Sequence, residues 1–193
     1  MGSTQETMEA LTRETKCLFG AFEESDRGLA LVVAEFFDVT LERLLRARFS
    51  SALEKQPKLI KPLFEGFGPL STFSSKISVS YASDLIQDWM ASELHVIRRI
   101  RNEFAHSLES KTFLDPKISR MVDNLASLAQ AVERIEKTSG WKKGKPKTSD
   151  MTTRYKFVMV CVRTGALLQS RVAVLESHGL EEMKRIFTSK PYL

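Results

Sequence analysis

Apolar residues recur every three or four positions over most of the chain, which is the spacing of amphipathic helices, and little of the sequence alternates as a strand would. The strongest segment runs from Arg27 to Phe49 and is preceded by Ser25 and Asp26, whose side chains suit an N-cap. Its apolar face predicts a central helix. The positions on that face are Leu29, Val32, Val33, Phe36, Phe37, Thr40, Leu41, Leu44 and Leu45.

The same periodicity predicts further helices, separated by a few breaks. Pro57 and Pro62 predict a non-helical connector, and Gly66-Phe67-Gly68-Pro69 predicts a compact turn. Asp115 followed by Pro116 is typical of a helix start. The sequence therefore predicts an all-α fold, a multi-helix bundle. The other predicted helices cover residues 7–22, 71–86, 92–108, 116–135, 153–176 and 180–187.

Residues 138–149 (TSGWKKGKPKTS) differ from the rest in composition and predict a basic linker. The linker divides the chain into a helical domain over residues 1–137 and a C-terminal helical extension over residues 150–193. We expect the extension to pack on the domain or on a dimer partner. The linker lysines are candidate contacts for nucleic acid, with Trp141 stacking on a base; a basic linker that contacts nothing specific is the alternative. These lysines are Lys142, Lys143, Lys145 and Lys147.

Composition narrows the class of protein without fixing its function. Apolar residues make up 42% of the chain and charged residues 27%, a balance that allows a buried core. The net charge of +5 permits a nucleic-acid partner without requiring one. Two distant cysteines, Cys17 and Cys161, give no metal-ligand spacing, so no metal or cofactor is expected. The polar N-terminus and the short apolar runs predict a cytoplasmic protein without a membrane segment.

Candidate chemistry gathers on the predicted helix 92–108. His106 follows Arg98, Arg101 and Asn102, and an Arg that binds phosphate beside a His that transfers a proton suits phosphate chemistry. Five residues of helix turn His106 about 140° from Arg101. The two side chains therefore meet only if the helix ends near Ala105, or if a second copy supplies the missing partner.

A structural interpretation of the same segment stays open. In it, Asn102 and His106 hydrogen-bond to backbone groups near the helix end. The neighbouring arginines would then form ion pairs with Glu93, Glu103 or Glu109.

Three blocks of the sequence resemble the signature blocks of the mannitol operon repressor family, in the same order and spacing. They are residues 25–32 (SDRGLALV), 63–77 (LFEGFGPLSTFSSKI) and 97–107 (IRRIRNEFAHS). The resemblance to this family covers residues 9–125. The region after Gly140 shows no such resemblance, and we interpret it as a segment added to the family's domain. The resemblance implies a bacterial negative regulator of transcription with an all-α fold. It also implies a fold without a classical DNA-reading helix and action partly through regulatory protein partners.

Arg101-Asn102-x-x-x-His106 is also similar to the Arg-x4-His motif of HEPN-superfamily ribonucleases. That resemblance implies that Arg101 holds a phosphate, Asn102 supports it and His106 transfers a proton, with the site assembled across a dimer. Leu108 stands where active members often have Tyr, which puts catalysis in doubt. We therefore expect a homodimeric, repressor-like binding module, with a protein or nucleic-acid partner, and hold a metal-independent ribonuclease as the alternative.

Overall fold

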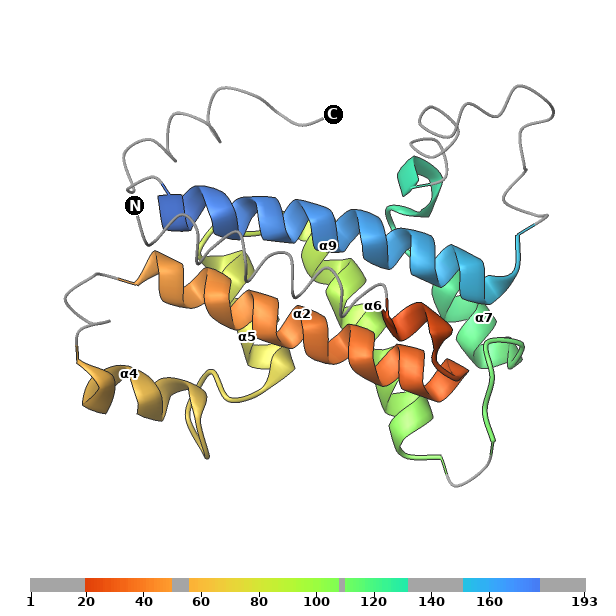
Figure 1. Ribbon diagram of the computed structural model, residues 1–193, viewed down its shortest axis with the longest axis horizontal. Coiled ribbons are helices and arrows are strands. Elements are labelled where there is room, and N and C mark those ends of the chain that lie inside the picture. Colours follow the sequence, from red (N-terminus) through yellow and green to blue (C-terminus); the bar gives the residue numbers. More distant parts are fainter. Residues whose placement is uncertain (1–19, 50–55, 108–109, 132–150, 178–193) are drawn as a thin grey trace.

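The computed structural model describes residues 20–49, 56–107, 110–131 and 151–177, and the elements in this part of the chain are all helical (Figure 1). The all-α prediction is confirmed. The predicted helix 180–187, most of the predicted helix 7–22 and the basic linker lie outside the described residues. In chain order the elements are η1 (Ala21–Glu23), α2 (Asp26–Arg48), α4 (Pro57–Phe64), α5 (Phe73–Ala82), α6 (Asp88–Ala105), α7 (Pro116–Asp123) and α9 (Thr153–Ser177).

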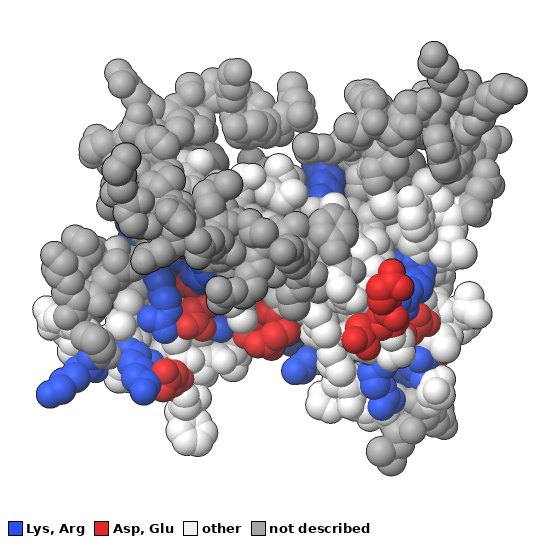
Figure 2. Space-filling view, in the orientation of Figure 1, with Lys and Arg blue, Asp and Glu red and all other residues white. Residues whose placement is uncertain are grey.

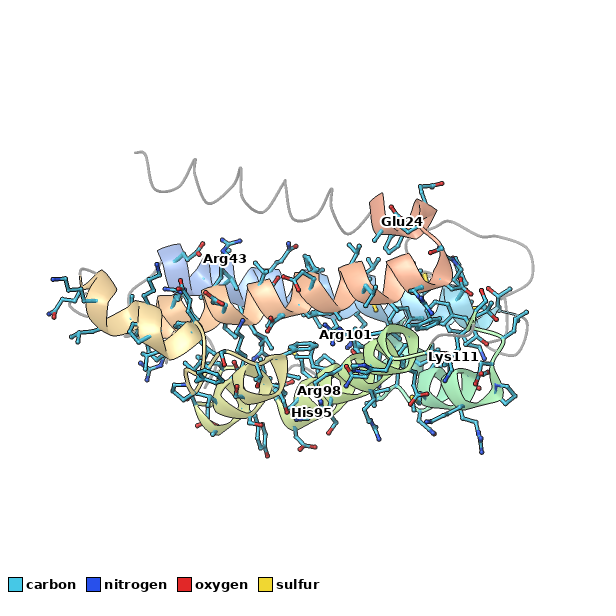
Figure 3. The ribbon with its side chains drawn as sticks, turned by 90° about the horizontal axis from the view of Figure 1, so that it is seen from below. Glu24, Arg43, His95, Arg98, Arg101 and Lys111 are labelled. Atoms are coloured by element: carbon cyan, nitrogen blue, oxygen red, sulfur yellow. The ribbon has the colours of Figure 1, made fainter. Side chains whose placement is uncertain are left out.

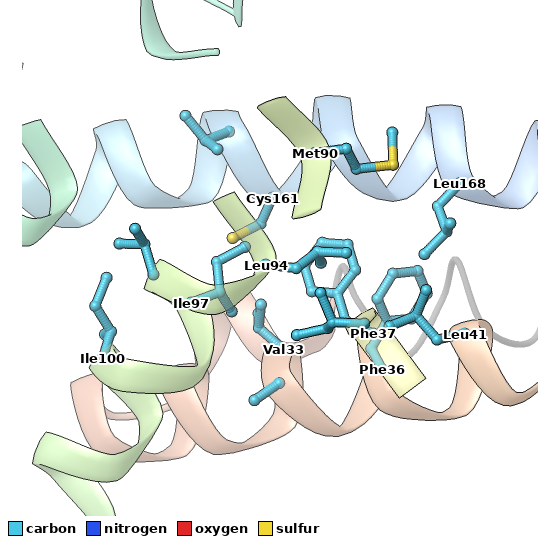
Figure 4. Packing of buried hydrophobic residues seen from close by; sticks show 14 of the residues in the cluster. Val33, Phe36, Phe37, Leu41, Met90, Leu94, Ile97, Ile100, Cys161 and Leu168 are labelled. Carbon is cyan, nitrogen blue, oxygen red and sulfur yellow. The ribbon is translucent and has the colours of Figure 1, made fainter. Parts of the chain in front are cut away.

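Helix α2 is the centre of the bundle because α5, α6 and α9 all pack against it (Figure 1). The Ser25 hydroxyl caps its start by accepting a hydrogen bond from the Gly28 N–H at 3.1 Å. Eight of the nine predicted apolar-face positions are buried, and Val32 is half-buried against the core. Side chains of α2, α6 and α9 interlock there (Figure 4), and each fully buried large one contributes about 1.5–3 kcal/mol.

Helix α9 runs alongside α2 and closes the core (Figure 1). Phe157, Val160, Cys161, Leu168 and Val172 on this helix are wholly buried. By length and composition α9 is apolar enough to cross a membrane, a property that the core helices of soluble proteins share. Its packing against α2 and α7 buries part of this apolar surface.

The predicted connector at Pro57 and Pro62 was wrong, because these residues lie in helix α4. Pro57 occupies the first helical turn, where a backbone N–H has no partner to lose. Pro62 removes one internal hydrogen bond, but Ile60 and Phe64 are only 6% and 5% exposed. Burial of these two side chains against the core outweighs the missing bond, which sequence propensity alone does not reveal.

The predicted helix 116–135 was also wrong as a continuous element. Helix α7 ends at Asp123, and helical structure resumes only at Leu128. Leu125 is buried in the break, and the Ser127 N–H donates to the Glu93 carboxylate at 3.0 Å. A tertiary hydrogen bond therefore replaces an intrahelical one at this point.

Two helix boundaries differ from the prediction. Helix α6 begins one turn earlier, at Asp88, and ends at Ala105, with His106 as its C-cap. Helix α5 ends at Ala82, before a turn in which Asp84 has a positive φ of 56°. Its start at Thr72 is a capping box, since the Thr72 and Ser75 side chains each accept a hydrogen bond from the other's backbone N–H.

Candidate functional site

The outward side of helix α6 carries most of its basic side chains. Its inward side is apolar, with Leu94, Ile97, Ile100 and Phe104 wholly buried. The outward residues are spaced so that they share one stripe, about 16 Å long at 1.5 Å per residue. They are His95, Arg98, Arg99, Asn102 and His106, and we call this set the α6 stripe.

The structure places the three predicted catalytic residues, Arg101, Asn102 and His106, at the end of α6. Arg101 and His106 are both exposed, and Arg101 Nη1 donates to Asn102 Oδ1 at 3.1 Å. The His106 N–H donates to the Asn102 carbonyl at 3.1 Å, so the helical path continues to His106. Arg101 therefore stays about 140° away from His106 around the helix. Figure 3 shows Arg101 nearer to α2 than Arg98 and His95 are.

Of the ion pairs that the structural interpretation offered to the arginines of α6, those with Glu93 and Glu103 are not formed. Glu93 is buried against Ser127 and Thr164, and Glu103 is bound by Lys111 at 2.9 Å and Lys117 at 2.6 Å. Glu109 lies outside the described residues. Within the described part of the chain, no carboxylate lies within 4.0 Å of a charged nitrogen of Arg98, Arg99 or Arg101.

Basic residues elsewhere in the fold are mostly paired with carboxylates. On the face that Figure 2 shows, most lysine and arginine side chains lie beside acidic ones. Arg43 binds Glu176 at 2.9 Å, and Lys156 binds Asp123 at 2.7 Å. Among the described residues, the arginines of α6 thus differ from most other basic residues, although Arg48, Lys58 and Arg120 also have no carboxylate within 4.0 Å.

The charges on the α6 stripe repel one another. Partial burial lowers the pKa of His95, and the positive charges of Arg98 and Arg99 lower it further. The Nε–H of Arg98 is buried without an acceptor among the described residues. The positive charges of Arg98 and Arg99 therefore disfavour a further positive charge on His95.

A buried carboxylate at Glu93 joins α6 to α9 and to the break after α7. Glu93 is wholly buried; it accepts hydrogen bonds from the Thr164 hydroxyl and from the Ser127 N–H. Burial raises its pKa more than these bonds and the charge of Arg163 lower it. Sequence reasoning did not single it out for this role, although its spacing from Ile97 and Ile100 places it on the apolar face of the helix.

A second exposed feature lies in the turn between α4 and α5. The Phe67 ring is 109% exposed relative to a reference residue, the highest value among the large apolar side chains described. The turn is tightly fixed: Gly66 has a φ of 60°, and the Leu70 N–H donates to the Leu63 carbonyl at 2.8 Å. A Cβ at Gly68 would lie 2.2 Å from the Pro62 carbonyl oxygen. The fold thus holds an aromatic ring in solvent on a rigid turn.

The remaining predicted site residues, Lys142, Lys143, Lys145 and Lys147, lie outside the described residues. The structure therefore neither brings them to the α6 stripe nor separates them from it.

Comparison with known proteins identifies a family and a fold neighbour. The sequence profile of a family described as mannitol repressor matches residues 22–170, well over half of the chain, and so includes much of α9. No curated protein matches the sequence. A chain in the X-ray structure of the MtlR–HPr complex from Escherichia coli has a similar fold, with a TM-score of 0.57 and 14% identity. The match covers 90% of this chain and 99% of that one.

Proposed function

The chain belongs to the mannitol repressor family, and we propose that it is a cytoplasmic transcriptional regulator that acts by binding a protein partner. The Escherichia coli structure with a similar fold is a complex of MtlR with HPr. We extend a partner of that kind to this chain as part of the proposal. Mannitol as the regulated sugar rests on the family name alone.

The observation that supports a protein partner is the exposed Phe67 ring. An aromatic side chain wholly in solvent contributes nothing to the core, yet the turn that carries it is held by backbone hydrogen bonds and by close packing at Gly68. Binding hot spots are enriched in large side chains that enter a partner's pocket, and a rigid turn lowers the entropy lost on binding. Phe67 has the properties of such an anchor.

Calorimetric titration with HPr from the same organism tests the proposal. We expect binding by the wild type, and a loss of at least about tenfold for Phe67→Ala, equivalent to about 1.4 kcal/mol. Leu114→Ala is the matched control, because Leu114 is 82% exposed and lies between α6 and α7. Absence of binding by the wild type would contradict HPr as the partner. Equal losses in both variants would contradict Phe67 as the anchor.

A second candidate function is a metal-independent ribonuclease that uses Arg101, Asn102 and His106. It is favoured by the exposure of Arg101 and His106 beside an Asn that already contacts the guanidinium. Arg101 and His106 point in directions about 140° apart around the helix, so a single chain does not bring the two side chains together. This candidate therefore requires a homodimer in which Arg101 of one copy meets His106 of the other.

Cleavage of RNA in EDTA, together with the solution mass, tests the second candidate. The expected result is a dimer whose RNA cleavage is lost in a folded His106→Ala variant, because no other group would transfer the proton. A monomer, or cleavage that persists in His106→Ala, would contradict the ribonuclease.

A further inference from the structure

We propose that the α6 stripe binds the phosphate backbone of a nucleic acid. This inference goes beyond the protein partner proposed above, and it does not depend on Arg101 or on any cleavage. It is carried by the spacing of the residues on this face and by the lack, among the described residues, of a carboxylate within 4.0 Å of the Arg98 and Arg99 guanidinium groups. Arg99 and His106 are exposed, and the other three members are half-buried.

The residues of the α6 stripe lie in a row along the helix and do not surround a pocket. Successive members are separated by three or four residues, which is about 5–6 Å along the helix axis. A single small anion would need donors that converge on one point, whereas the stripe presents them in a line about 16 Å long. A polymer with regularly repeated negative charges fits a line of this kind.

The chemistry of the side chains agrees with that ligand. Arg98 and Arg99 supply guanidinium groups, the usual donors to phosphate oxygens. His95 and His106 each supply at least one ring N–H, and Asn102 adds an amide that can donate to phosphate or base. The acidic residue beside the stripe is Glu103, four residues after Arg99, and its charge is compensated by Lys111 and Lys117. The next one on this face is Asp88, two turns before His95 and about 10 Å along the axis.

The same face is poorly suited to a protein or a lipid surface. None of the exposed large apolar residues in the described part of the chain lies on α6; they are Val39, Leu59, Phe67, Tyr81, Leu114 and Tyr155. Stable protein interfaces are usually centred on buried apolar or aromatic anchors, and membrane-surface helices insert an apolar face. A polyanion requires neither.

Fluorescence anisotropy over a range of salt concentrations, in EDTA, tests the proposal with a labelled single-stranded RNA and a duplex DNA of equal length. The expected result is salt-sensitive binding by the wild type. Arg98→Gln/Arg99→Gln should reduce the log–log salt slope by about 1.4 for RNA or 1.8 for DNA, because two phosphate contacts are lost. The polymer that binds more tightly at the same salt concentration identifies the source of the backbone, because duplex DNA gives the steeper slope per contact in any case.

Lys58→Gln/Arg120→Gln is the matched control, since it removes two exposed charges from α4 and α7. We expect its salt slope to change by less than the loss of one phosphate contact, which is about 0.7 for RNA or 0.9 for DNA. Arg98 is half-buried, so its replacement could disturb folding, and Arg99→Gln alone serves as a second variant. We expect it to reduce the salt slope by half as much as the double variant. Equal reductions in the α6 variants and the control, or no binding to either polymer, would overturn the proposal.

Discussion

Lys76 Nζ of α5 lies 2.9 Å from Glu42 Oε2 of α2, with only 5% of the lysine side chain exposed. The same amine lies 3.1 Å from Asp38, one turn earlier on α2. Glu42 also accepts a hydrogen bond from Arg46, whose guanidinium stacks 4.3 Å from the Phe64 ring of α4. One buried lysine thus connects α5 to the central helix, beside the group that contacts α4.

Replacing Lys76 should therefore destabilise the fold. Lys76→Met leaves Asp38 and Glu42 next to each other without their shared cation, and we expect unfolding to become easier by about 1–3 kcal/mol. The loss is below that of a fully buried pair because both carboxylates are partly exposed. Urea denaturation measures the change. Lys61→Met is the control; its pair with Glu65 is exposed, so a change below about 0.5 kcal/mol is expected.

Acid should weaken the same connection. Burial acts to raise the pKa of Glu42, but hydrogen bonds and charge from Lys76 and Arg46 outweigh it and hold the pKa below the ordinary value of 4.5. The folded protein therefore binds fewer protons here than the unfolded chain. The stabilisation is complete above about pH 4.5 and is lost as pH falls through the lower folded pKa. Denaturation at several pH values should show this loss, and it should be smaller in Lys76→Met.

Glu93 should behave in the opposite way. Its pKa is raised by burial, so its contribution to stability is largest at low pH and falls as pH rises above about 4.5. Glu93→Gln keeps an acceptor for the Ser127 N–H and offers a donor to the Thr164 hydroxyl, without the buried charge. We expect this variant to be at least as stable as the wild type at pH 7.

Glu93→Ala provides the contrast in the same measurement. It leaves the Ser127 N–H without an acceptor and opens a cavity, so a loss of about 2–4 kcal/mol is expected. A stability for Glu93→Gln as low as that of Glu93→Ala at pH 7 would show that the negative charge itself stabilises the fold.

The turn that presents Phe67 should respond unequally to changes in its two glycines. At Gly66 an added methyl group meets no atom within 4 Å, so Gly66→Ala should cost only the strain of its positive φ, about 1–2 kcal/mol. At Gly68 the new Cβ would collide with the backbone of Pro62 and Leu63. We expect Gly68→Ala to cost about 3 kcal/mol. Thermal unfolding checks the order, and equal melting temperatures would contradict the geometry of this turn.

The basic linker gives a separate prediction for nucleic-acid binding. Replacing Lys142, Lys143, Lys145 and Lys147 by Gln should reduce the salt slope by up to about 3, if all four contact phosphate groups of single-stranded RNA. The measurement is the same anisotropy titration in a chain with an intact α6 stripe. An unchanged slope would exclude the linker from binding.

Local sequence patterns were sufficient to predict a helix and its cap where both depend on residues close together in the chain. The apolar positions of the segment from Arg27 to Phe49 predicted the central helix, and Ser25 predicted its cap, because both depend on neighbours one turn away. Asp115 and Pro116 predicted the start of α7 for the same reason. The segment 97–107 also identified the helix on which the unpaired basic residues lie.

Contacts between distant segments decided the rest. Pro62 is tolerated in α4 because Ile60 and Phe64 are buried, and the helix after Asp123 breaks where Glu93 binds Ser127. The sequence by itself determined an all-helical chain, since helical periodicity is a local property. Only the tertiary structure decided which charges are paired, because an ion pair depends on residues far apart in the chain. That is why two features emerged only with the fold: the exposed ring of Phe67, and the lack of a carboxylate partner for the α6 arginines among the described residues.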